Sequence, residues 1–100
     1  MQEKLNNLMK YIEKAVRAYN KYRGLEVHAK IIGYSGNTLI IDFKGTYCQT
    51  CGLYDYFEDL VYDLKDLIDL EIKIENAEPI GRDTYRVRYA ITRVKEEGGV

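Results

Sequence analysis

Apolar and polar residues follow two different periods along this chain, and each change of period marks a new element. Residues 3–23 place an apolar side chain at every third or fourth position, which predicts an amphipathic helix. Residues 52–68 repeat this period and predict a second helix. Four runs alternate at every second residue, as half-buried strands do: 25–34, 38–43, 70–75 and 84–94. The predicted order is α-β-β-α-β-β.

The segments between these runs predict how the elements pair. Ser35-Gly36-Asn37 separates the first two strands and suits a tight antiparallel hairpin, because glycine reaches positive φ without steric cost. Pro79 and Gly81 predict a turn before the last strand. The first helix is basic and the second acidic, so we expect them side by side with their charges meeting at the edge of the contact.

The fold class that follows is α+β. We expect a two-layer sandwich with two helices on one face of a four-stranded, mainly antiparallel sheet. A chain of 100 residues predicts one domain over residues 1–100, with 95–100 as a frayed tail.

The composition limits the cellular environments and the classes of partner that we expect for this protein. With 46% hydrophobic and 31% charged residues the chain is typical of a globular protein, and its net charge of −1 does not favour general binding of nucleic acids. It contains neither an apolar run of the ~20 residues that a membrane span needs nor a signal-peptide core, so a cytoplasmic location is expected. Abundant Lys and Glu with only two glutamines indicate a thermophilic origin, and thermophiles tolerate intracellular disulfides.

The distinctive chemistry lies in the only two cysteines, Cys48 and Cys51, which form a C-x-x-C between the second strand and the second helix. The positive end of a helix dipole favours thiolate over thiol at that place. Dithiol redox chemistry, part of a metal or cluster site, and a structural disulfide all fit such a pair. A closed tetrahedral metal site takes four ligands, and the chain has one histidine besides. A metal or iron–sulfur cluster is therefore expected to be shared by two chains of a homodimer.

Two family resemblances bear on this pair. The run EVHAKIIGYSGNTLIIDFKGTYCQTC, followed by the acidic helix and LEIKIEN, resembles the NifU-like C-terminal domain of iron–sulfur scaffolds over residues 3–76. That resemblance implies cluster binding through Cys48 and Cys51. The shorter run IIDFKGTYCQTC looks like the thioredoxin strand and active-site turn, with Tyr47 where that family has tryptophan. This second resemblance implies dithiol redox chemistry.

A different function is suggested by Lys30, Arg86 and Arg88, which share the outward face of the predicted sheet. A basic stripe with aromatic neighbours is typical of surfaces that bind RNA or single-stranded DNA. Carboxylates interrupt this stripe at Glu26, Asp42, Glu71 and Glu75. The alternative hypothesis is a non-enzymatic module that binds nucleic acid or protein and is stabilised by a Cys48–Cys51 disulfide.

Tyrosines gather in the sequence around the cysteines. Tyr47, Tyr54 and Tyr56 predict an apolar rim at which a partner or a second copy docks. The sequence has no Gly-rich phosphate loop, and its one histidine has no recognisable serine and aspartate partners for a triad. No catalytic residue is assigned, and we do not expect an enzyme.

Overall fold

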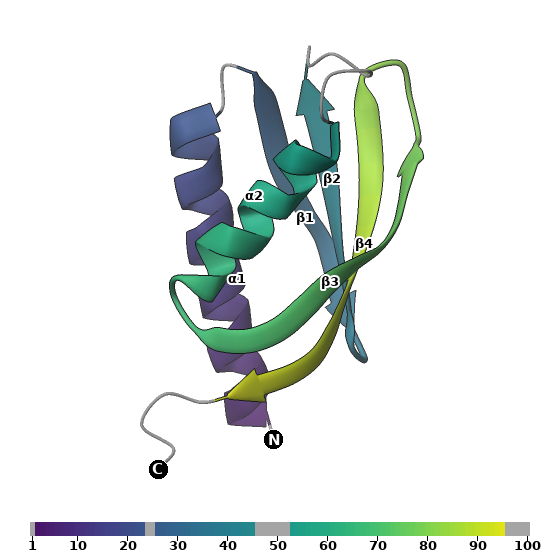
Figure 1. The fold of residues 1–100 in the computed structure, drawn as a ribbon. Helices are drawn as coiled ribbons and strands as arrows, with labels where there is room; N and C mark the ends of the chain where they lie inside the picture. The colour runs from purple at the N-terminus through teal and green to yellow at the C-terminus, as the bar shows by residue number, and fades with distance from the viewer. Residues whose placement is uncertain (1, 24–25, 46–52, 96–100) are drawn as a thin grey trace.

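The computed structural model describes residues 2–23, 26–45 and 53–95. Within them the chain forms two helices and four strands in the predicted order, and both helices cover one face of the sheet (Figure 1). The predicted α+β class is confirmed. The elements are α1 (Gln2–Arg23), β1 (Val27–Ser35), β2 (Thr38–Gly45), α2 (Leu53–Lys65), β3 (Asp69–Pro79) and β4 (Thr84–Lys95).

The sheet is antiparallel throughout, with strand order β1-β2-β4-β3. The hairpin between β1 and β2 forms as predicted, and Gly36 in its turn has a φ of 61°. The two central strands are β2 and β4, so β1 and β3 are the edges. The C-terminal strand β4 therefore lies between β2 and β3.

The apolar stripes of both helices pack against one face of this sheet. Phe43 of β2 is fully buried where they meet. Its ring centroid lies 5.6 Å from that of Tyr19 on α1 and 5.0 Å from that of Phe57 on α2. Aromatic rings at these separations attract each other beyond the burial of their area. This cluster joins both helices to the sheet.

Two predicted boundaries are corrected. Strand β3 continues through Pro79, which pairs with Tyr85, although this region was expected to be a turn. Proline is compatible with an edge strand because its missing N–H is not needed by a further neighbour. The turn is shorter, and the Ile80 N–H donates to the Thr84 carbonyl across 3.0 Å. Helix α2 ends at Lys65, although the apolar period continues to the buried Ile68.

No helix among the described residues combines the length and the apolar character that crossing a membrane requires.

We expect Phe43→Ala to lower the free energy of unfolding by about 3–5 kcal/mol, because a fully buried ring leaves a cavity between three elements. Chemical denaturation followed by circular dichroism measures this change. Ile32→Ala is the matched control, since the Ile32 side chain is 41% exposed on the same sheet. A loss no larger than that of the control would contradict the central role of the Phe43 ring.

Candidate functional site

The predicted thiol site lies in residues 46–52, outside the described part of the chain, and so does Tyr47 of the predicted rim. The roles assigned to Cys48 and Cys51 therefore stay predictions. The structure describes the residues on both sides of this segment, at the end of β2 and at the start of α2. Strand β2 ends at Gly45, and α2 begins at Leu53, two residues after Cys51 in the sequence.

The attachment at Gly45 is held by close backbone packing. Its N–H donates to the carbonyl oxygen of Asp83, in the turn between β3 and β4, across 3.0 Å. A Cβ atom placed on Gly45 would overlap the carbonyl oxygen of Glu26 and crowd the Cα of Val27. Only glycine permits this approach of the two backbones. The end of β2 is thus fixed from two sides.

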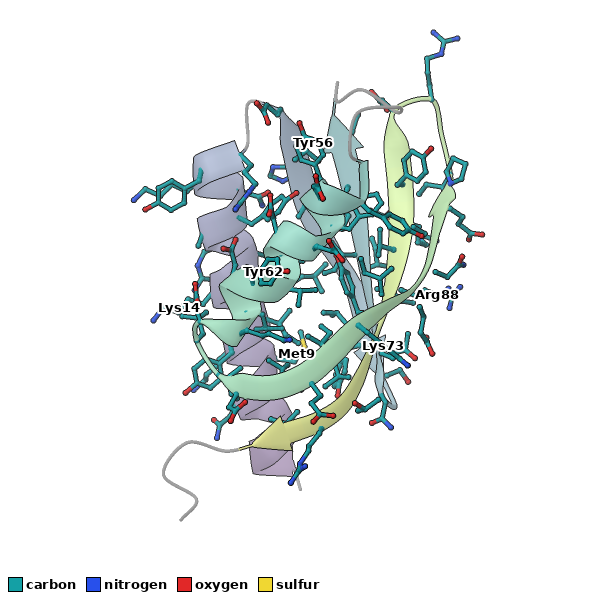
Figure 2. The ribbon with its side chains drawn as sticks, viewed as in Figure 1. Met9, Lys14, Tyr56, Tyr62, Lys73 and Arg88 are labelled. Atoms are coloured by element: carbon teal, nitrogen blue, oxygen red, sulfur yellow. The ribbon has the colours of Figure 1, made fainter. Side chains whose placement is uncertain are left out.

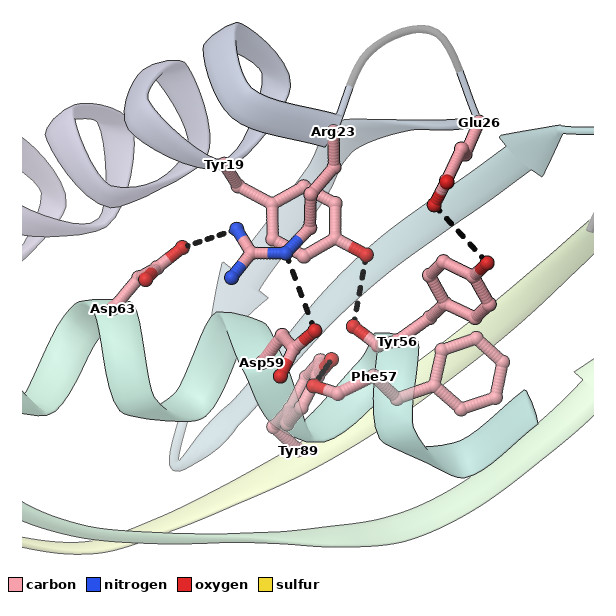
Figure 3. Close-up of polar contacts among 8 residues, drawn as sticks. All are labelled: Tyr19, Arg23, Glu26, Tyr56, Phe57, Asp59, Asp63 and Tyr89. Carbon is pink, nitrogen blue, oxygen red and sulfur yellow. Dashed lines mark hydrogen bonds and ion pairs between the residues drawn. The ribbon is translucent and has the colours of Figure 1, made fainter. Parts of the chain in front are cut away.

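The attachment at α2 is held by two buried tyrosine hydroxyls (Figure 3). Tyr19 of α1 donates to the carbonyl oxygen of Tyr56, and Tyr89 of β4 donates to that of Phe57, each across 2.8 Å. Both tyrosine side chains are fully buried. The first turns of α2 are therefore bonded to the other helix and to the sheet.

The same burial keeps both phenols neutral. Loss of hydration raises the pKa of Tyr19 and of Tyr89 well above the usual value of 10.0. The Arg23 guanidinium acts in the opposite direction on Tyr19, but burial has the larger effect. As neutral phenols, both groups keep the proton that they donate to α2.

Opposite charges meet where α1 and α2 pack, as the sequence predicted. The Arg23 guanidinium lies 4.7 Å from the centre of the Tyr19 ring, and its Nε and Nη1 lie 3.2 and 3.0 Å from carboxylate oxygens of Asp59 and Asp63 (Figure 3). Partial burial raises the pKa of the Asp63 carboxyl, although Arg23 lowers it. Such half-exposed pairs stabilise by about 0–1 kcal/mol each and mainly select the helix pairing.

The two described tyrosines of the predicted rim have different surroundings. Tyr54 is 53% exposed, and its ring lies 5.7 Å from that of Phe57. Tyr56 is half-buried, and its hydroxyl donates to a Glu26 carboxylate oxygen across 3.1 Å. Tyr54 is available to a partner, whereas Tyr56 already joins α2 to Glu26, the residue before β1.

The predicted nucleic-acid residues lie on the face of the sheet that the helices leave uncovered. The strand register places Lys30, Asp42, Arg86 and Glu78 in one row across all four strands. Arg86 donates from Nε and Nη2 to the two carboxylate oxygens of Asp42, across 2.8 and 3.0 Å. Arg88 lies in the next row, opposite Ile40. Charges alternate along the first row, so it does not form the continuous cationic track that a phosphate backbone favours.

A groove that the sequence analysis did not identify runs between α2 and the edge strand β3, with a volume of about 370 Å³. Its walls carry two exposed tyrosines, Tyr54 and Tyr62, eight positions apart on α2. At this spacing the two tyrosines lie on a side of the helix outside its core stripe. The helical period in the sequence therefore already indicated an exposed aromatic face there. The lining residues are Tyr54, Glu58, Val61, Tyr62 and Lys65 of α2 and Ile72, Lys73 and Ile74 of β3.

Clusters of metal-ligating side chains concern only the part of the chain that the structure describes. Within it, no three residues of the types His, Cys, Asp and Glu gather closely enough to hold a metal ion.

We expect the protein to lose stability in alkali because of its two buried phenols. Their pKa values are raised in the folded state, so the unfolded chain ionises first. The free energy of unfolding should be independent of these groups below about pH 10 and should fall as the pH rises further. Denaturation at about pH 8 and about pH 11 measures the difference, with Tyr absorbance reporting ionisation.

The matched variants separate this effect from general alkaline unfolding. Tyr19→Phe and Tyr89→Phe should each cost about 0.5–1.5 kcal/mol at neutral pH and together flatten the alkaline decline. Tyr22→Phe should do neither, because Tyr22 is 78% exposed. An equally steep decline in the double variant would contradict the assignment.

No protein-family model matches this chain, and no curated protein matches its sequence. Among solved structures, one that probes heme distortion in the H-NOX family superposes with a TM-score of 0.48 at 11% identity, over 90% of this chain and 50% of that one. A Cs H-NOX mutant carrying 4-cyano-L-phenylalanine also gives 0.48 at 11% identity, over 90% and 51% of the two chains. The chain spans about half the length of these structures, and a likeness at this level assigns it neither family nor ligand.

Proposed function

We propose that this protein is a small dithiol carrier that holds an iron–sulfur cluster or a metal ion as cargo on Cys48 and Cys51. The observation that carries the proposal is the attachment of the cysteine segment. The segment runs from Gly45, which is packed against the Glu26 backbone, to α2, whose first turns accept hydrogen bonds from Tyr19 and Tyr89. Binding residues are typically found in loops that a rigid scaffold holds in place.

The chemistry of the donors supports this cargo. Thiolates are soft ligands that suit zinc and iron–sulfur clusters. Cys51 precedes the first residue of α2 by two positions, and the N-terminal end of a helix stabilises a negative charge close to it. The thiolate is the form of cysteine that binds a metal.

The number of donors requires a second chain. A complete four-thiolate site takes two pairs, and each chain has only Cys48 and Cys51. We therefore propose that two chains contribute one pair each. Tyr54, three residues after Cys51 in the sequence, is exposed, and an exposed aromatic side chain is favourable for a contact between two chains.

Anaerobic expression and purification test the proposal directly. We expect a coloured protein with visible absorbance, or a colourless one with stoichiometric zinc, at close to one cluster or ion per two chains. Metal and sulfide analysis gives the stoichiometry. Cys48→Ser and Cys51→Ser should each abolish the bound cargo, because removal of one thiolate leaves the site incomplete.

Gln49→Ala is the matched control, since it changes the residue between the cysteines and keeps both thiols. It should retain the cargo, and circular dichroism should show all three variants folded. Protein that is free of metal and cluster under anaerobic conditions contradicts the carrier. In that case thiol counting and insulin reduction distinguish a structural disulfide from dithiol redox activity.

A further inference from the structure

The groove between α2 and β3 places apolar surface and opposite charges on one face of the molecule. Tyr62 lies on the side of α2 turned away from the sheet, and Lys73 lies on the strand that passes beside it (Figure 2). The Tyr62 side chain is 61% exposed, whereas Val61 is buried at the base of the groove. An exposed aromatic ring over an apolar base is typical of the centre of a protein interface.

Two exposed side chains of opposite charge on α2, Glu58 and Lys65, are placed symmetrically about this centre. Glu58 precedes Tyr62 by about one helical turn, and Lys65 follows it by about one turn. Both side chains are exposed, and neither forms an ion pair among the residues described here. Because they are seven positions apart, they lie on nearly the same line along the helix.

We propose that this face binds a second copy of the chain, with the two α2 helices antiparallel about a two-fold axis beside Val61 and Tyr62. In a two-fold interface, each contact of residue i with residue j occurs twice. The antiparallel arrangement sets Glu58 against Lys65 of the partner subunit, and Lys65 against Glu58 of the partner subunit. Tyr62 then packs against Val61 of the partner subunit near the axis. Two opposite-charge pairs thus flank one apolar centre.

This contact is separate from the one proposed to share cargo. From the axis to Leu53, α2 rises by about 13 Å at 1.5 Å per residue. The antiparallel arrangement therefore directs the N-terminal ends of the two α2 helices to opposite ends of the dimer. The interface does not depend on the thiols, and it should form in a variant that lacks both of them.

The test uses the Cys48→Ser/Cys51→Ser protein at low ionic strength, where charge complementarity is least screened. Sedimentation equilibrium should show a dimer. E58K and K65E should each weaken the dimer by about tenfold or more, because each sets like charges together twice. An equimolar mixture of E58K and K65E should recover dimers, since both cross-chain pairs regain opposite signs only in the mixed dimer.

Controls separate the interface from folding and from general charge effects. Y62A should weaken the dimer, whereas Y22A should not, because Tyr22, although more exposed than Tyr62, lies on α1. E13K changes the net charge as E58K does, but on α1, and should leave the dimer intact. A monomeric Cys48→Ser/Cys51→Ser protein, a dimer indifferent to E58K and K65E, or a mixture that stays monomeric would each overturn the proposal. Loss of cargo alone affects only the carrier function.

Discussion

Two hydroxyl groups that have no access to water determine how α2 sits on the rest of the molecule. A phenol buried without a partner costs several kcal/mol, so the fully buried Tyr19 and Tyr89 have to find acceptors. They find them in the adjacent carbonyls of Tyr56 and Phe57. A shift of α2 along its axis would remove both acceptors at once. The register of this helix, and with it the end point of the cysteine segment, is therefore set by polar bonds within an apolar core.

The aromatic cluster around Phe43 contributes packing energy that helps to offset the desolvation of the buried tyrosine hydroxyls. The rings of Tyr19 and Phe57 contact Phe43 from two different helices, and that packing brings the Tyr19 hydroxyl close to α2. Arg23 lies at the solvent-facing edge of the contact between the two helices. Its guanidinium lies over the Tyr19 ring and forms an ion pair with Asp59. Packing, hydrogen bonding and surface charge all favour one arrangement of the two helices. Agreement between these levels is what specifies a single native structure.

Much of this fold could be predicted because its signals are local. The period of apolar residues located both helices, the Gly36 turn identified the first hairpin, and opposite helix charges predicted the contact that Arg23 makes. The extension of β3 to Pro79 could not be predicted, because proline is compatible with a strand only at an edge, and edges are defined by the whole sheet.

The candidate sites also divide into features that a local sequence pattern identifies and features that depend on tertiary contacts. A C-x-x-C is a sequence pattern, so Cys48 and Cys51 stood out, whereas the acceptors of Tyr19 and Tyr89 come from residues more than 30 positions away. The pairing of Arg86 with Asp42 depends on strand register, which no local pattern specifies. The groove beside Tyr62 depends on how β3 passes α2. Local patterns therefore identify reactive residues, while tertiary contacts decide their surroundings.

The edge strand β3 has a further consequence. Its free side offers backbone donors and acceptors to any other strand, which is a common starting point for aggregation. Irregular register next to Glu75 and the ring of Pro79 interrupt the far half of that edge. A foreign strand could align only with the half nearest α2, and a short pairing of this kind is weak. Strand pairing through the β3 edge is therefore confined to a short stretch of backbone.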